Sequence, residues 1–147
     1  MKRIARSAIV EHAAAAMYAL VEDIESYPQF LPWCREAQVR ERSPLRTVAT
    51  LAIGLKGLNY KFTTQNANRP HEAIDLQLLE GPFRHFAAHW RFSALDTYAA
   101  RIEFAMEYQL AGALVSRALG PLFDTIADTM VDAFKRRADA VYGQAAR

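Results

Sequence analysis

The last third of the chain, Gly112 to Gly143, constrains the fold most, because its pattern requires a long apolar surface to pack against. Large apolar residues recur there at three- to four-residue steps, and most charged residues fall on the opposite side, as in an amphipathic helix. The apolar stripe contains Val115, Leu119, Leu122, Ile126, Met130, Phe134 and Val141, widened by Phe123, Ala127 and Val131. Such a helix either closes tightly on a sheet or lines one wall of a cavity.

Gly120 and Pro121 interrupt this stripe. A proline inside a helix costs roughly 3 kcal/mol, whereas the first helical position accepts it. We therefore expect the main helix to begin at Pro121, with residues 113–119 as a separate short turn or helix. A hinge at Gly120 would then allow the long helix to act as a lid.

Six extended segments precede the helix, and short turns rich in Gly, Pro, Ser and Asp separate them. Their alternation of apolar and polar residues indicates an antiparallel meander with one buried face. The segments are Trp33–Arg42, Thr47–Leu55, Leu58–Asn68, Ala73–Glu80, Phe83–Leu95 and Ala99–Leu110, with a glycine-flanked hairpin turn at Gly54 to Gly57.

The N-terminal part adds a strand at Ile4 to Val10, a helix at Ala13 to Asp23 and a short turn opened by Pro28. This order predicts one α+β domain over residues 1–147. We expect a strongly bent antiparallel sheet of about seven strands, wrapped around a long C-terminal helix, with two short helices after the first strand.

The composition suits a globular protein, with 52% hydrophobic and 23% charged residues. A net charge of +2 is too small to indicate nucleic acid, so we expect no DNA partner. The single cysteine, Cys34, fits a reducing compartment and is expected to be a small buried residue. We find no signal peptide and no apolar run of about 20 residues, so we predict a cytoplasmic protein.

Few residues suit catalysis or metal binding. His85 and His89 share one strand face, but that spacing places them about 13 Å apart, too far to share a metal ion. The sequence has no phosphate-binding loop, metal-ligand spacing or nucleophile elbow. We therefore predict no catalytic residue, no metal site and no enzymatic activity.

Several short motifs together resemble one known family. They are Val21 to Cys34 (VEDIESYPQFLPWC), Glu80 to Phe83, Trp90 to Phe92, Met130 to Phe134, Arg137-Ala138 and Val141 to Gly143. In this order they resemble the coenzyme Q-binding protein and ribosome association toxin family of the START-like superfamily, which also contains polyketide cyclases and lipid transport proteins. The resemblance implies a helix-grip fold with a cavity between sheet and helix.

Apolar alternation alone is equally typical of a close-packed core, and the resemblance is what favours a cavity. We expect its lining to include Tyr60, Phe62, Trp90, Phe92, Phe104, Met106, Tyr108, Phe123, Ile126, Ala127 and Met130. Phe86 and Ala88 stand where the family usually carries leucine and glycine, and their extra volume would narrow the cavity. Tyr60 or Tyr108 could donate a hydrogen bond to a quinone head.

The segment from Tyr27 to Trp33, which we call the elbow, follows the first helix and is rich in aromatic and proline residues. It could be a rigid packing element, or a portal lip where a lipid enters, with Tyr27, Phe30, Leu31 and Trp33 at the rim.

The resemblance implies two activities, and it leaves a cyclase or aromatase, which would need a buried acid–base pair, as a further alternative. The first is non-enzymatic binding of ubiquinone or a related isoprenoid lipid in support of respiratory electron transport, with transient contact at the inner membrane and no cofactor besides the bound lipid. The second is a toxin-like protein that binds the large ribosomal subunit and blocks subunit association. Two groups of basic residues could serve the second: Arg35, Arg40, Arg42 and Arg46, and Lys135 to Arg137.

Overall fold

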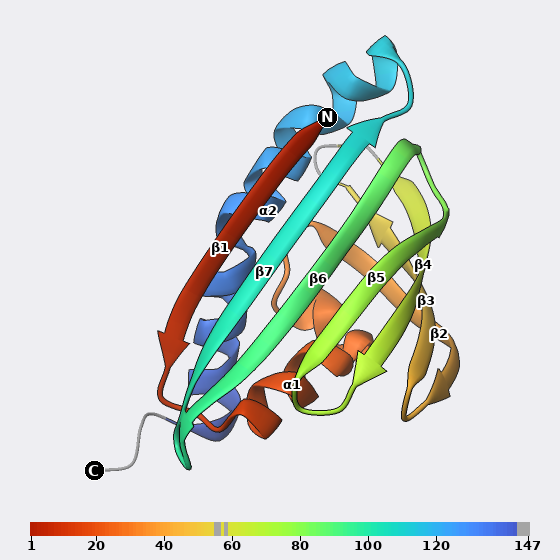
Figure 1. Ribbon diagram of the computed structural model, residues 1–147. Coiled ribbons are helices and arrows are strands. Elements are labelled where there is room, and N and C mark those ends of the chain that lie inside the picture. Colours follow the sequence, from red (N-terminus) through yellow and green to blue (C-terminus); the bar gives the residue numbers. More distant parts are fainter. Residues whose placement is uncertain (55–56, 58, 144–147) are drawn as a thin grey trace.

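The computed structural model describes residues 1–54, 57 and 59–143. Strand β1 (Lys2–Val10) is followed by helix α1 (Ala14–Glu22) and the 3-10 helix η1 (Ile24–Gln29). The meander then contains β2 (Cys34–Ser43), β3 (Arg46–Ile53), β4 (Tyr60–Arg69), β5 (Ala73–Glu80), β6 (Phe83–Asp96) and β7 (Ala99–Leu110). Helix α2 (Ala113–Tyr142) ends the described part of the chain (Figure 1).

One antiparallel sheet contains all these strands, in the order β1-β7-β6-β5-β4-β3-β2. Strand β1 pairs with the last strand, from Lys2 opposite Tyr108 to Val10 opposite Ala100. Figure 1 shows the sheet curving from β1 round to β2, with α2 running behind β1 and β7 and α1 lying at one end. The predicted helix-grip fold is confirmed.

The core lies between the sheet and α2 because each central strand turns alternate side chains inward. On β6 and β7 these are Phe86, Ala88, Trp90, Phe92, Ile102, Phe104, Met106 and Tyr108, all buried. Leu119, Phe123, Ile126, Ala127 and Phe134 of α2 face them, and each is less than 4% exposed. The predicted apolar stripe is therefore the face that packs on the sheet, except for Val141 near the end of the helix, which is 49% exposed.

Helix α2 differs from the prediction at its start. It runs without interruption from Ala113 to Tyr142 and contains Pro121, so the separate short helix at residues 113–119 is wrong. The proline removes one backbone hydrogen bond, but Leu119 and Phe123 are buried on either side of it and hold this turn against the core. The predicted hinge at Gly120 lies inside this continuous helix.

Two smaller features concern the turn after β3 and the start of α1. The expected turn at Gly54 to Gly57 includes residues 55 and 56, which lie outside the described residues. Helix α1 begins at Ala14 without a side-chain cap. His12, in the connection between β1 and α1, pairs with Asp139 of α2 across 2.8 Å.

Candidate functional site: a cavity between the sheet and helix α2

A cavity of about 70 Å³ lies between the inner face of the sheet and α2. Strands β3 to β7, the elbow and α2 all contribute apolar side chains, and β4 adds two polar ones. The lining comprises Ile24, Tyr27, Trp33, Ala49, Leu51, Phe62, Thr64, Asn66, Leu76, Phe86, Ala88, Trp90, Phe104, Met106, Phe123, Ile126, Met130 and Phe134.

Most of the predicted lining residues are found there, namely Phe62, Trp90, Phe104, Met106, Phe123, Ile126 and Met130. The structure places the other four outside the lining. Phe92 lies two residues beyond Trp90 on β6 and packs edge-on against Tyr18 of α1, with ring centroids 5.7 Å apart. Ala127 is fully buried in the packing of α2, and Tyr60 is half-buried at the start of β4.

Tyr108 has a different hydrogen-bond partner from the one predicted. Its hydroxyl donates to Oδ1 of Asp124 on α2 across 3.3 Å, and Lys2 forms an ion pair with the same carboxylate. Burial, together with the negative charge of Asp124, raises the pKa of Tyr108 to about 12. The two tyrosines proposed as head-group donors therefore lie outside the cavity lining.

The polar side chains that do line the cavity come from β4. Thr64 and Asn66 are 5% and 4% exposed, and the Thr64 hydroxyl donates to Oδ1 of Asn66 across 2.9 Å. The alternation of β4 turns Phe62, Thr64, Asn66 and Asn68 to the same face. Extending that alternation beyond Thr64 to the end of the strand would have identified Asn66 from the sequence.

The cavity is small, as expected from the volume of Phe86 and Ala88, which both line it. The Phe86 ring packs against Phe62 and Phe83, with centroids 5.9 Å and 5.1 Å away. Pockets for drug-sized ligands measure about 300–1,000 Å³, so a ligand of that size would have to displace part of the wall. Met106 and Met130 are the most adaptable residues in the lining.

The elbow is more buried than a portal rim would be. Tyr27 and Trp33 line the cavity, but Trp33 is 5% and Leu31 1% exposed, so neither lies on an open rim. The Phe134 ring of α2 packs against the elbow, with its centroid 5.5 Å from that of Tyr27 and 5.1 Å from that of Phe30. The packing interpretation therefore describes Leu31 and Trp33 better than the portal one.

Phe30 remains at the outer side of the elbow. It is half-buried, and the Arg137 guanidinium lies over its ring, 5.0 Å from the centroid. Arg137 also donates to Oε1 of Gln29 across 2.9 Å. These contacts fasten the elbow to α2 at the edge of the cavity.

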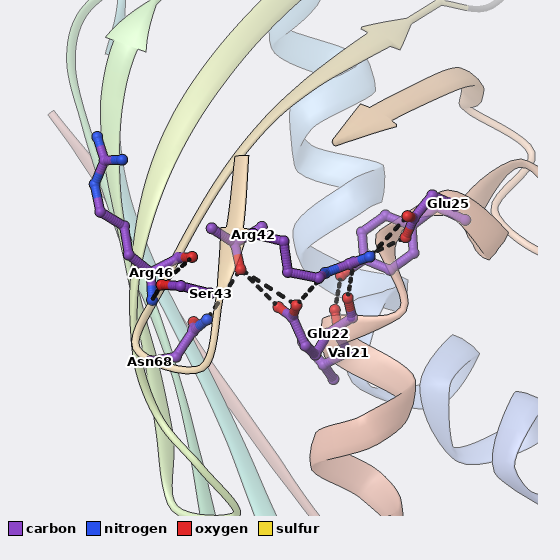
Figure 2. A network of polar contacts seen from close by, with 9 residues as sticks. Val21, Glu22, Glu25, Arg42, Ser43, Arg46 and Asn68 are labelled. Atoms are coloured by element: carbon purple, nitrogen blue, oxygen red, sulfur yellow. Dashed lines mark hydrogen bonds and ion pairs between the residues drawn. The ribbon is translucent and has the colours of Figure 1, made fainter. Parts of the chain in front are cut away.

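A polar network joins α1 and η1 to the sheet (Figure 2). Arg42 donates to Glu22 and to both carboxylate oxygens of Glu25, at 2.7–2.9 Å. These hydrogen bonds lower the pKa of Glu25. The buried Thr47 hydroxyl donates to Glu22 across 3.2 Å and accepts from Nδ2 of Asn68 across 3.0 Å.

Within the described part of the chain, three of the seven basic residues in the two groups form ion pairs with acidic side chains. Arg42 is paired as described, Arg46 forms an ion pair with Glu41, and Arg136 pairs with Asp132 one turn earlier on α2. The predicted basic clusters are thus mixed-charge surfaces in the structure.

The remaining nucleophile and imidazole candidates lie away from the cavity. Burial raises the pKa of Cys34 to about 11, and the residue is 4% exposed, which fits the small buried residue expected. His85 lies on the outer face of the sheet, where it contacts Glu107 across 3.0 Å. Among the described residues, no group of three or more His, Cys, Asp or Glu side chains could hold a metal ion.

Comparison with known proteins decides the family. Residues 10–135 match the family described as polyketide cyclase / dehydrase and lipid transport. The chain belongs to this family. It is 42% identical over 140 residues to the ribosome association toxin RatA of Pseudomonas aeruginosa, covering 95% of this chain and 97% of that protein. It is 37% identical to RatA of Escherichia coli K12, covering 97% and 90%.

More distant relatives include a coenzyme Q-binding protein. The mitochondrial coenzyme Q-binding protein COQ10 homolog B of Xenopus laevis is 26% identical, covering 97% of this chain and 61% of that protein. Among solved structures, protein CC1736 of Caulobacter crescentus is 28% identical with a TM-score of 0.74, covering 97% and 99%. The Zhui aromatase/cyclase of Streptomyces sp. R1128 has a TM-score of 0.82 at 16% identity, covering 94% and 93%, which shows a shared fold alone.

The resemblance found in the sequence is thereby confirmed. In addition, no helix in the described part of the chain combines the length and the hydropathy needed to cross a membrane.

Proposed function

We propose that the protein binds a hydrophobic isoprenoid or lipid, with ubiquinone as the first candidate, in the cavity between the sheet and α2, without covalent chemistry. The observation that carries this proposal is a cavity with apolar walls on both sides and a small polar group on one strand. Binding sites for apolar ligands have this composition, in which a few polar atoms orient the ligand. The family membership and the distant coenzyme Q-binding relative support the same ligand class.

A cavity of about 70 Å³ is small beside the roughly 300–1,000 Å³ of pockets for drug-sized ligands. Binding of a quinone ring requires the wall to open, and the flexible side chains of Met106 and Met130 supply the adaptable part on opposite sides of the cavity. Among the lining residues, Tyr27, Leu51, Leu76 and Met130 are half-buried, and the others are buried. The ligand would therefore bind by displacing side chains, while the sheet and α2 keep their positions.

The polar groups of the cavity favour binding over acid–base catalysis. In the described lining, hydroxyl and amide groups belong to Tyr27, Thr64 and Asn66, and no carboxylate or imidazole is among them. Burial raises the pKa of Tyr27, and its hydroxyl already donates to the carbonyl of Val21. A cyclase mechanism requires a group that exchanges a proton near neutral pH, and this lining does not favour it.

The test fills the cavity. Ala88→Leu adds three carbon atoms to the inner face of β6, whereas Ala87→Leu adds the same atoms to the outer face of the same strand. A short-chain ubiquinone should raise the melting temperature of the wild type and of Ala87→Leu, because a ligand that binds only the folded state stabilises it. Ala88→Leu should lose this shift. An equal shift in all three proteins would place the ligand elsewhere, and no shift in any of them would contradict the proposal.

Ribosome association is the second candidate, favoured by relatives named RatA at 37–42% identity over nearly the whole chain. Under this second candidate the protein acts in the cytoplasm and contacts a ribosomal subunit. Under the first candidate it would take up its lipid ligand at the surface of the inner membrane. Overexpression should increase free subunits at the expense of joined ribosomes in sucrose gradients. An unchanged gradient profile would argue against this candidate, and retention of the effect in Ala88→Leu would show that it does not need the cavity.

A further inference from the structure

Strand β4 differs from the other strands on its inner face. Where β6 and β7 turn aromatic and aliphatic side chains inward, β4 buries Thr64, Asn66 and Asn68 in succession, each 4–5% exposed. A buried amide without a complete set of hydrogen bonds costs about 1–3 kcal/mol. Polar residues in such positions therefore need a structural or a functional explanation.

Asn68 has a structural explanation through its Nδ2 atom, although its Oδ1 atom is buried without a partner among the described residues. Its Nδ2 donates to the Thr47 hydroxyl across 3.0 Å, and Thr47 in turn donates to Glu22 of α1 (Figure 2). Asn68 thus belongs to the network that holds α1 on the sheet. Asn66 lies two residues away on the same face but lines the cavity instead.

The two ends of the Asn66 amide differ. Oδ1 accepts the hydrogen bond from Thr64, which orients the side chain. Nδ2 has no hydrogen-bond partner among the described residues. The surrounding protein atoms do not enclose it completely, so it keeps some accessible surface. Since the residue as a whole is 4% exposed and lines the cavity, this N–H group faces the cavity.

The opposite wall offers no alternative partner. Phe123, Ile126 and Met130 of α2 line that side with apolar atoms. A ligand would therefore direct an acceptor atom towards β4 and its apolar part towards α2.

We propose that Asn66 donates a hydrogen bond through Nδ2 to a carbonyl oxygen of the ligand, so that the cavity selects apolar molecules that carry a ketone or quinone carbonyl over hydrocarbons of the same shape. This inference rests on the proposed function, because it names the chemical class of ligand for that same cavity. Thr64 acts as a positioning residue that fixes the orientation of the amide.

Two probes of nearly equal shape test the inference: acetophenone, which has a carbonyl oxygen, and α-methylstyrene, which has a CH₂ group in its place. Their binding is followed in the wild type by NMR of the methionine methyl groups and of the Asn66 side-chain amide. Both probes should shift the Met106 and Met130 signals, and acetophenone alone should move the Asn66 amide protons downfield. If both probes shift the methyl groups but the Asn66 amide responds to neither or to both equally, this inference is wrong while cavity binding stands. If neither probe shifts the methyl groups, the proposed function itself fails.

Substitutions assign the selectivity to one side chain. In Asn66→Leu, the affinity ratio of acetophenone to α-methylstyrene should fall about tenfold, the equivalent of one hydrogen bond of about 1.4 kcal/mol. Thr64→Val keeps the Asn66 donor but removes the hydrogen bond that orients it, so the ratio should fall by less than in Asn66→Leu. An unchanged ratio in Asn66→Leu would overturn the proposal. So would a wild type that prefers 1-phenylethanol, which has a hydroxyl group in place of the carbonyl, to acetophenone. If Asn66→Leu does not fold, the Asn66 amide signal of the wild type decides the question.

Discussion

Cys34 illustrates how burial controls the chemistry of a single side chain. The thiol is 4% exposed, and its Sγ lies 3.5 Å from the carbonyl oxygen of Glu36. Desolvation disfavours the charged thiolate and raises the pKa to about 11. Cys34 should therefore behave as a packing residue, as its position after Trp33 suggested.

This predicts slow modification of Cys34 in the native protein. At pH 8, a thiol with this pKa is ionised in about one molecule in a thousand, against about a quarter for an unperturbed cysteine. Labelling with a chromogenic disulfide reagent should thus be at least about 100-fold slower in native protein than in urea. Equal rates in the two states would contradict the buried position of the thiol.

At the same scale, the sequence predicted the large apolar lining residues better than the polar ones. Phe62, Trp90 and Phe104 follow from strand alternation alone, because each lies on the apolar face of its strand. The assignment of Tyr108 depended on a partner 16 residues away, Asp124, and no local pattern identifies such a contact. Asn66 was missed because a polar residue on an inner face contradicts the general rule that buried faces are apolar.

At the level of elements, α2 shows that tertiary packing outweighs local preference. Gly120 and Pro121 are poor helix residues, yet the helix continues through both. The sequence pattern gives the register of the buried face correctly, since that depends on spacing alone. The local cost of Pro121 could not be weighed against the burial of Leu119 and Phe123 without the sheet that covers them.

Two glycines of α2 provide a matched pair of substitutions. A Cβ atom at Gly120 or at Gly112 would meet nothing within 4 Å, but Gly112 has a φ of 94°. Gly120→Ala should stabilise the protein by about 1 kcal/mol, because alanine loses less backbone entropy in a helix. Gly112→Ala should destabilise it by about 1–3 kcal/mol, since its backbone conformation is accessible essentially to glycine alone. Urea denaturation measures both, and stabilisation by Gly112→Ala would contradict the described helix start.

At the level of the whole molecule, the fold was predictable because each strand, turn and helix follows from its own pattern. The closure of the sheet by β1 beside β7 depends on pairing between residues about 100 positions apart, and the family resemblance supplied what local patterns could not. The size of the cavity was less accessible to prediction. It results from how Phe86, Phe123 and Phe134 fill the space between sheet and helix, which is a property of the packed structure.

The central claim is that an apolar ligand enters the space between the sheet and α2, and the four methionines test it within one spectrum. Met106 and Met130 line the cavity, Met17 is buried outside the lining, and Met1 is exposed. Titration of a short-chain ubiquinone into protein labelled with ¹³C at the methionine methyl groups should shift the Met106 and Met130 signals in a saturable manner and leave Met1 and Met17 in place. Unchanged Met106 and Met130 signals at saturating quinone, or shifts confined to Met1, would contradict the account.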